Sequence, residues 1–585
     1  MTGNVGRPIL PVSFSSLALF AGVAVLAVFI LYPVFFTVSS SFWSGEPGLA
    51  GHYTLGNYEA LLGSGETYVT VFNTFVQAGG SAAIAIGLGT VLGIITVRTD
   101  TPFRRALFYL PYFPLAFPVL IANQAWIYLF EKRAGLLNIV FGRLGFSTST
   151  FSIYSWPGMI FASAMALTPI AYLTISAAMR NMDTSLEEAS RASGSGVLNT
   201  LRNVSIPLMV PSIFSAFLLC FTLSAGSFET PAMIGLPAGI NVMMSSVYDN
   251  VYGGVPNYAA ASTESVLLLA IVMVVVYLYN RSLRRSRRFE VVTGKGYSSG
   301  RVLSIGRWKY VAFAIIAAYL ILAIGLPLFT ITLLSLVPIW LPNDLFGRLS
   351  LKNFQFLLSN SSGAYPALAN SLIASLIAAS VILGVALVIV FAARRTTIRG
   401  RGLLEGLGMF PISMPALVLS FGLLWAFLTI PTGLYGTLGV MVIALTVSLL
   451  PQGIRSISGG VVQVQMELQE AARASGASMA TTIRRIFLPL ARPSLVGAWL
   501  YVFIGSFNAL GAVLLLQSSD NQLFSTLLWS FFSSSQPSAE QAFAAGCVIL
   551  FLILVCAIAV MVVVQRRLER SPRPASERLP GPVAP

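Results

Sequence analysis

The stretch Glu470-Ala471-Ala472-Arg473-Ala474-Ser475-Gly476 occurs twice in this chain. Its other copy, Glu188-Ala189-Ser190-Arg191-Ala192-Ser193-Gly194, lies 282 residues earlier, close to half of the 585-residue length. Between Glu188–Pro211 and Glu470–Pro493, 11 of 24 positions are identical. Each copy stands between long apolar segments, so the repeat divides the chain into two related halves.

The composition is that of a membrane protein. Hydrophobic residues make up 56% of the chain and charged residues only 9%, and the mean hydropathy is +0.81. A soluble protein carries about 25% charged residues. The net charge of +15 lies in short loops between apolar runs, which indicates membrane topology and no nucleic-acid partner. The three cysteines lie in apolar segments without metal-ligand spacing, so we expect no disulfide framework and no metal site.

A membrane-spanning helix needs about 20 mostly apolar residues, whereas a barrel strand would need about 10 alternating ones. We therefore predict an all-α polytopic membrane protein with about twelve transmembrane helices. The predicted helices lie at 16–38, 71–97, 107–130, 157–179, 206–225, 264–280, 309–337, 369–391, 403–429, 436–454, 488–515 and 542–564.

Positive charge in the loops predicts the orientation. The linker is rich in arginine, whereas the loops 39–70 and 226–263 contain no Lys or Arg. The positive-inside rule then places both termini and both copies of the repeated stretch in the cytoplasm. Six helices in each half make the repeat parallel rather than inverted. The predicted domains are a first half, 1–280, a basic cytoplasmic linker, 281–308, a second half, 309–570, and a cytoplasmic tail, 571–585.

The repeated stretch predicts a short exposed helix. Its Glu, Ala and Arg residues favour a helix, and Gly194 and Gly476 stand where a left-handed C-cap belongs. A proline, Pro207 or Pro489, then marks the return to the membrane. A rigid helix of this kind indicates a docking contact. The simpler alternative is a plain helical connection between two spans.

The pattern Glu-Ala-Ala, three residues, Gly, nine residues, then aliphatic, any residue, aliphatic and Pro resembles the signature loop of binding-protein-dependent ABC importer permeases. The second copy fits this pattern, and the first departs from it at Ser190. The resemblance covers about 60–280 and 360–565 and implies a type I importer permease fold. It assigns ATPase coupling to Glu188, Ala189, Arg191, Gly194, Pro207, Glu470, Ala471, Ala472, Arg473, Gly476 and Pro489.

The resemblance also implies partners and a location. The two loops would be coupling helices for two copies of a cytoplasmic ABC ATPase subunit in the bacterial inner membrane. A periplasmic or lipid-anchored substrate-binding protein would serve the other side, and membrane lipid would surround the chain.

The chain contains no phosphate loop of its own. That motif needs Gly-x-x-x-x-Gly-Lys-Ser/Thr, and of the four lysines only Lys295 follows a glycine, with Gly296 next to it. We expect no catalytic residue and no cofactor in this chain, with ATP-Mg on the partner ATPase. An ion-gradient secondary transporter would instead predict inverted repeats or buried charge relays. A membrane scaffold would need no paired docking loops.

Polar groups within spans are costly and often functional. The segment Gly226-Ser227-Phe228-Glu229-Thr230-Pro231 follows the fifth helix, and Gly505-Ser506-Phe507-Asn508 matches it in the second half. The alternative for each polar candidate is a helix–helix contact or a loop position. The candidates for the substrate pathway are Glu229, Asn508, Asn123, Gln124 and Glu264.

The segment Phe228-Glu229-Thr230-Pro231, followed by Ile234-Gly235, and the fused twelve-helix layout resemble the ferric-iron permease group. That resemblance favours ferric iron as the substrate. The group has relatives for thiamine, polyamines and phosphonates, and the binding protein usually selects the substrate, so these stay alternatives.

Aromatic residues and prolines give two further expectations. Tryptophans near span ends typically anchor a helix at the membrane interface, and prolines within apolar segments typically kink the helix. The tryptophans expected at the interface are Trp126, Trp156, Trp340, Trp425 and Trp529, and the prolines expected at kinks are Pro111, Pro114, Pro118, Pro411 and Pro415.

Overall fold

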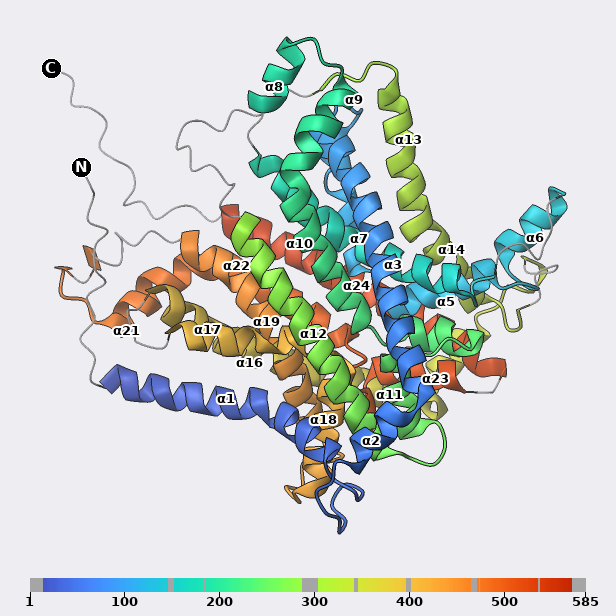
Figure 1. Ribbon diagram of the computed structural model, residues 1–585, viewed down its shortest axis with the longest axis vertical. Helices are drawn as coiled ribbons and strands as arrows, with labels where there is room; N and C mark the ends of the chain where they lie inside the picture. The colour runs from blue at the N-terminus through green and yellow to red at the C-terminus, as the bar shows by residue number, and fades with distance from the viewer. Residues whose placement is uncertain are drawn as a thin grey trace.

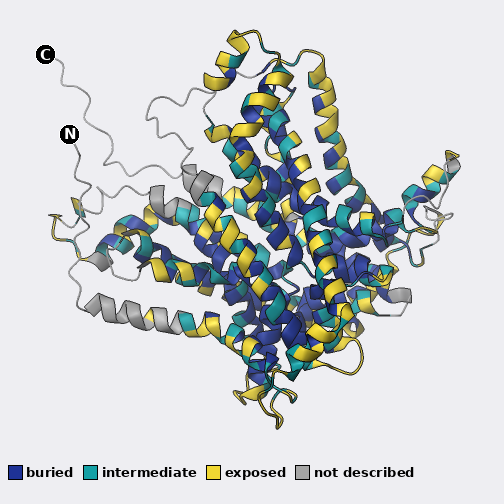
Figure 2. Cartoon of the chain, viewed as in Figure 1, coloured by how far each residue is buried: buried dark blue, intermediate teal, exposed yellow. Residues whose placement is uncertain are grey.

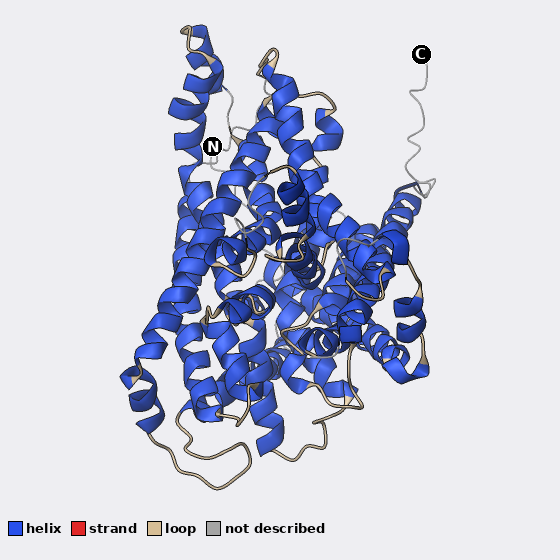
Figure 3. Ribbon diagram, turned by 90° about the vertical axis from the view of Figure 1, so that its right-hand side faces the viewer, coloured by secondary structure: helices blue, strands red, loops and turns tan. Residues whose placement is uncertain are grey.

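The computed structural model describes residues 14–145, 152–182, 185–286, 303–340, 346–395, 401–463, 471–472, 474–534 and 537–570. Every regular element within these ranges is a helix (Figure 3). In the first half the α-helices are α1 Phe14–Ser41, α2 Gly56–Gly63, α3 Gly65–Gly93, α4 Arg104–Leu107, α5 Val119–Phe130, α6 Leu136–Arg143, α7 Trp156–Asn181, α8 Ser185–Ala192, α9 Val197–Thr200, α10 Ile206–Ala225, α11 Met243–Tyr252 and α12 Tyr258–Ser286. In the second half they are α13 Trp308–Leu320, α14 Leu326–Leu336, α15 Lys352–Leu357, α16 Ala364–Arg395, α17 Arg401–Met409, α18 Ala416–Thr429, α19 Leu438–Gln463, α21 Met479–Thr482, α22 Leu488–Asn508, α23 Phe524–Ser533 and α24 Pro537–Arg570.

The predicted spans are found, with three changes. Within the described residues, nine helices are long and apolar enough to cross a membrane, or eleven if each of two bent pairs counts as one span. The span predicted at 16–38 lies within α1. The segments 107–130 and 403–429 are wrong as single helices because both are broken. The helix predicted at 488–515 ends earlier, at Asn508.

Proline causes both breaks. Arg104–Leu115 meets Val119–Phe130 at 92°, and Gly402–Ser413 meets Ala416–Thr429 at 101°. Phe117 and Met414, the residues before Pro118 and Pro415, are extended, with φ/ψ of −93°/115° and −106°/112°. A residue before proline is pushed out of the helical region by contact with the proline ring. The expected kinks at Pro118 and Pro415 are therefore real, and each is close to a right angle.

The two halves repeat their polar contacts as well as their helices. Asn73 Nδ2 donates to the carbonyl oxygen of Asn241 at 2.8 Å, and Thr74 Oγ1 accepts from the backbone N–H of Met243 at 2.9 Å. In the second half Asn370 donates to Gln522 O at 3.1 Å, and Ser371 accepts from Phe524 N at 2.7 Å. Satisfying the first N–H groups of a helix fixes its start. These pairs therefore fix α11 and α23 against α3 and α16.

A further pair extends the repeat beyond the region of sequence resemblance. Asn57 Nδ2 donates to the carbonyl oxygens of Ser41 and Trp43 at 3.0 and 2.9 Å. Asn353 makes the same two bonds, to Ser335 O at 3.0 Å and Val337 O at 2.9 Å. Each asparagine satisfies carbonyl groups at the end of the first long helix of its half, where no intrahelical partner exists.

The first helix of each half packs against the bent span of the other half. Helix α1 contacts α18, and α14 contacts α5. Figure 1 accordingly shows the blue α1 beside the yellow and orange helices of the second half. One hydrophobic cluster runs through both halves, from Ile30 to Leu554. The two halves thus form one packed body.

The outside of this body is apolar. Large hydrophobic side chains are exposed on the outer helices, such as Phe72 on α3, Tyr277 on α12 and Leu552 on α24. Figure 2 shows exposed residues along these helices around a buried centre. Exposed apolar surface on this scale is typical of helices that face lipid, because lipid tails are as apolar as leucine.

The end of the linker binds the loop after α3. Leu303 N donates to Arg98 O at 2.8 Å, and the Asp100 carboxylate accepts from Ile305 N at 3.0 Å and from Ser304 Oγ at 3.1 Å. The hydrogen bond from Ile305 lowers the pKa of Asp100. The contact is therefore present at neutral pH and weakens as the pH falls through that lowered value.

We predict that Gly422→Ala weakens the packing of α1 on α18. A Cβ at Gly422 would clash with the carbonyl oxygen of Pro33 and with Thr37 Oγ1 on α1. Such overpacking costs about 1–3 kcal/mol, so the midpoint of thermal unfolding in detergent should fall. Gly384→Ala is the matched control, since a Cβ on that part of α16 meets nothing within 4 Å. Equal midpoints for the two variants would contradict the close approach.

Candidate coupling loops and translocation pathway

Both copies of the repeated stretch end in the same turn. Gly194 and Gly476 have φ of +86° and +83°, in the left-handed region. The residue after each glycine donates its N–H back to the helix, from Ser195 to Ser190 O at 3.1 Å and from Ala477 to Ala472 O at 3.0 Å. A glycine adopts this conformation without the cost that a Cβ adds. The predicted left-handed caps are therefore confirmed in both loops.

The return to the membrane is also repeated. A widened π-helical turn, Leu201–Ser205 or Ile483–Phe487, comes directly before α10 and α22. Pro207 and Pro489 are the second residues of those helices. A proline ring clashes with the carbonyl group four residues earlier in a regular helix, and a wider turn moves that group away. The prolines thus account for the same distortion in both halves.

The predicted coupling residues are accessible where the structure describes them. Glu188, Ala189 and Arg191 are exposed on α8, which protrudes at the top of Figure 1. Ala471 is exposed and Ala472 is half-buried. Glu470 and Arg473 lie outside the described residues. The surface of α8 therefore presents one carboxylate and one guanidinium to a docking partner.

The glutamate beside the motif has a different role. Glu187 is buried, and its Oε1 accepts from Ser205 Oγ at 2.7 Å and lies 3.5 Å from Arg98 Nε. Arg98 Nη2 also donates to Met179 O at 2.7 Å. These bonds join α8 to the ends of α3, α7 and the turn before α10. The first loop is thus attached to the membrane helices by a buried polar network.

The second loop is attached by aromatic packing. Phe487 occupies the position that corresponds to Ser205, 282 residues later, and it is fully buried. Its ring centroid lies 5.6 Å from that of Phe391 on α16, nearly perpendicular to it. Ser190, the departure of the first copy from the motif, bonds Thr200 through their hydroxyl groups at 3.1 Å. The two loops share a shape but differ in the chemistry that holds them.

Three aromatic rings meet where the halves face each other. The centroid of Phe228 lies 4.9 Å from that of Tyr248 on α11 and 4.9 Å from that of Trp529 on α23. Trp529 Nε1 donates to the Tyr248 hydroxyl at 3.0 Å. Tyr248 and Trp529 are the sixth residues of their helices, so they are equivalent positions of the two halves. This aromatic cluster closes the space between α11 and α23.

The polar pathway candidates fall into two groups. Asn123 Nδ2 donates to Thr230 Oγ1 at 3.0 Å, and Glu264 accepts from Ser246 Oγ at 2.9 Å and from Asn250 Nδ2 at 3.2 Å. These contacts join neighbouring elements within the first half. By contrast, the side-chain oxygen atoms of Gln124 and Asn508 are buried without a hydrogen-bond partner.

The expected pairing across the halves is not formed. Glu229 is half-buried, next to Phe228 of the aromatic cluster. Because Asn508 Oδ1 has no partner, the matched positions Glu229 and Asn508 do not hydrogen-bond through that atom. Their place on the substrate pathway stays a prediction.

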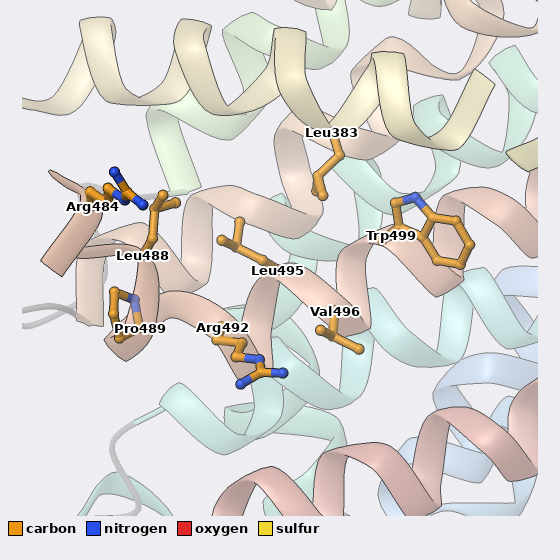
Figure 4. A pocket seen from close by; sticks show the side chains of 8 residues that line it. All are labelled: Leu383, Arg484, Leu488, Pro489, Arg492, Leu495, Val496 and Trp499. Carbon is orange, nitrogen blue, oxygen red and sulfur yellow. The ribbon is translucent and has the colours of Figure 1, made fainter. Parts of the chain in front are cut away.

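A groove of about 520 Å³ lies along α22 beside the second loop (Figure 4). Arg484 stands at one end and Trp499 at the other, with Arg492 and apolar side chains between them. Its remaining wall is Leu383 on α16. Since all these residues belong to the second half, the groove lies away from the contact between the halves, and we do not assign it to the pathway.

Comparison with known proteins identifies the family. The family model described as "Binding-protein-dependent transport system inner membrane component" matches residues 85–289 and 384–570. The chain belongs to this family. It contains the domain twice, and it is a fused permease subunit of an ABC importer in the inner membrane.

Its relatives include ferric transport permeases. It is 25% identical over 502 residues to the "Putative ferric transport system permease protein FbpB 1" of Haemophilus influenzae, covering 85% of this chain and 77% of the relative. It is 25% identical over 521 residues to the "Ferric transport system permease protein FbpB" of Actinobacillus pleuropneumoniae, covering 86% and 72%. A solved bacterial ABC transporter for alginate import matches with a TM-score of 0.39 and 15% identity, covering 47% of this chain and 95% of that chain.

The sequence alone misplaced the tryptophans of this permease. Trp126, Trp425 and Trp529 are only 1%, 5% and 4% exposed, so the expectation that they anchor the helices at the membrane interface is wrong for them. The offset of 281 residues between Tyr248 and Trp529 is the signal that would have pointed to the aromatic cluster. The network at Glu187 was missed because it joins residues far apart in the sequence.

We predict that Glu187→Ala destabilises the permease and that Glu188→Ala does not. Removing Glu187 leaves the buried Arg98 guanidinium without its carboxylate, which costs about 3 kcal/mol when a buried pair is broken. Glu188 is exposed one residue away and serves as the control. The midpoint of thermal unfolding in detergent should fall only for Glu187→Ala. A fall of the same size in both variants would contradict the network.

Proposed function

We propose that this permease forms the translocation pathway of an ATP-driven importer for ferric iron and couples to two copies of a separate ATPase through its two loops. The observation that carries the coupling is the repeated geometry of those loops. Both have a left-handed glycine cap, a widened turn and a proline at the same positions. A docking partner with two equal copies would need two surfaces of this kind.

The physical mechanism is rigid-body gating. Movement of the ATPase subunits would displace α8 and the segment that ends at Gly476. Rigid packing passes such a displacement to the helices attached to each loop. The network from Glu187 to Arg98 and the contact of Phe487 with Phe391 provide those attachments. The aromatic cluster between α11 and α23 would separate as the halves move apart.

ATP hydrolysis belongs to the partner in this proposal. The chain lacks the phosphate-loop pattern, so ATP-Mg would be bound by the ATPase subunits alone. The loops would lie in the cytoplasm together with both termini. A periplasmic or lipid-anchored binding protein would deliver the substrate to the opposite side.

The named relatives favour ferric iron as the substrate. Thiamine, polyamine and phosphonate are the alternatives. A specific observation for an ion-gradient transporter is lacking among the described residues.

Reconstitution tests this function. Proteoliposomes that contain the permease and its ATPase should take up radioactive iron from the loaded binding protein only when ATP is present. Liposomes without the ATPase, or with a hydrolysis-deficient ATPase, are the controls. Uptake of iron without any ATPase would overturn the proposal. Binding proteins loaded with spermidine, thiamine or a phosphonate, compared in the same assay, distinguish the substrates.

We predict that Gly194→Ala and Gly476→Ala each uncouple transport. A Cβ in the left-handed region costs about 1–2 kcal/mol, which would shift the cap and the docking helix. ATP-dependent uptake should fall several-fold while the amount of folded protein stays unchanged. Gly196→Ala is the control in the same loop, because Gly196 has φ of −67° and open space around its Cα. Normal uptake in both cap variants would argue against a coupling role for the turns.

A further inference from the structure

A second polar feature lies between the halves and has no part in the coupling mechanism. A cavity of about 500 Å³ is bounded by α5 and the segment after it in the first half, and by α23, the start of α24 and the chain after α14 in the second. These elements lie together in Figure 1. The polar side chains on its wall are Gln124, Tyr128, Glu131, Tyr154, Ser534, Glu540 and Gln541.

Two buried acceptors face this cavity without partners. Gln124 is 2% exposed and Gln541 is 4% exposed, and the side-chain oxygen of each has no hydrogen-bond partner. They come from different halves of the chain, on α5 and α24. Buried polar atoms are normally satisfied, so a ligand that donates hydrogen bonds or carries positive charge would fit here.

Two carboxylates make the wall negative. Glu540 accepts a hydrogen bond from the Tyr128 hydroxyl, and Glu131 accepts from the backbone N–H of Arg133 at 2.7 Å. Burial, together with the charges of Glu540 and Glu131, raises the pKa of Tyr154 to about 12, so this phenol is neutral at physiological pH. Lys132 and Arg133 follow Glu131 in sequence, but the described wall of the cavity contains no Lys or Arg.

The cavity adjoins the aromatic cluster. Phe532 lines it, and the ring centroid of Phe532 lies 5.5 Å from that of Trp529. One layer of aromatic side chains thus separates the cavity from the place where α11 and α23 meet. A ligand held in the cavity would be next to the contact that must open during transport.

We propose that this cavity is a binding station for a hard metal cation that keeps its water shell, a role that rests on the proposed import function. Its wall offers carboxylate, amide and phenol oxygens, which suit hard cations. The volume is many times that of one water at about 30 Å³, so the ion fits together with its coordinated water. The described residues contain no group of three or more His, Cys, Asp or Glu that would strip that water.

The same wall gives selectivity and release. Coordinated water molecules donate hydrogen bonds, and Gln124, Gln541 and Glu540 accept them. Contacts made through water are weaker than direct metal ligation, and a conducting site must bind weakly enough to let the ion leave. An anionic phosphonate would meet two carboxylates and is disfavoured by charge.

Terbium luminescence tests the station on the purified full-length permease in detergent. Tb³⁺ is a hard cation that prefers oxygen ligands and emits when nearby Tyr or Trp rings are excited, and Tyr128, Tyr154 and Trp340 line the cavity. We expect saturable emission that La³⁺ displaces. Lifetimes in H₂O and D₂O should report several retained water molecules.

Three variants locate the binding. Glu540→Gln keeps the size of the side chain and an acceptor for Tyr128 but removes the charge, and Gln541→Leu removes one unpartnered oxygen. Each should weaken apparent Tb³⁺ affinity about tenfold, a change of about 1.4 kcal/mol. Glu59→Gln, an exposed position on α2, is the control and should bind as the wild type does. Thermal unfolding midpoints verify that each variant is folded.

The outcomes separate this inference from the proposed function. Unchanged Tb³⁺ affinity in folded Glu540→Gln and Gln541→Leu overturns the station, even if ATP-driven iron uptake is normal. Displacement of Tb³⁺ by spermidine at lower concentration than by La³⁺ overturns the metal in favour of an organic cation. Loss of Tb³⁺ affinity in both variants supports the station, and it does so even if reconstituted uptake identifies a different cargo.

Discussion

The contact of each first helix with the bent span of the opposite half holds this permease together. Pro118 and Pro415 turn the chain through 92° and 101°, which exposes α5 and α18 to the other half. Helix α14 then packs on α5, and α1 packs on α18. Gly422 lets α1 approach so closely that a Cβ would meet its backbone. Because helices in lipid associate through close packing of small residues, these contacts couple the halves as one body while leaving their central faces free to move.

The two loops illustrate how a repeat preserves shape while its chemistry diverges. The caps at Gly194 and Gly476 and the prolines at Pro207 and Pro489 keep the same backbone path. Beneath that path, the first half uses the ion pair of Glu187 with Arg98, and the second uses the packing of Phe487 on Phe391. A charged hydrogen bond depends on the partner and its direction, whereas an aromatic contact tolerates small shifts. The halves would therefore respond differently to the same displacement of their loops.

The centre of the molecule combines an apolar closure with a polar chamber beside it. Phe228, Tyr248 and Trp529 close the contact between α11 and α23, and Asn73, Thr74 and their second-half equivalents set where those helices begin. A negative cavity lined by residues of both halves adjoins that closure. An apolar layer excludes hydrated ions, since stripping their water is costly, so movement of this layer would control access to the chamber.

The sequence by itself determined the helical class, the parallel repeat, the two loops and the glycine caps, because apolar length, the 282-residue offset and the demand of a left-handed turn for glycine are local properties. It also located the bends, since proline acts on its immediate neighbour. Only the tertiary structure decided which helix crosses to the other half, that Glu187 rather than Glu188 is buried against Arg98, and that Trp126, Trp425 and Trp529 are inside. Those facts depend on contacts between residues far apart in the chain. An apolar stretch specifies that a helix is buried in lipid or protein, but only the packing partners decide which of its faces meets which.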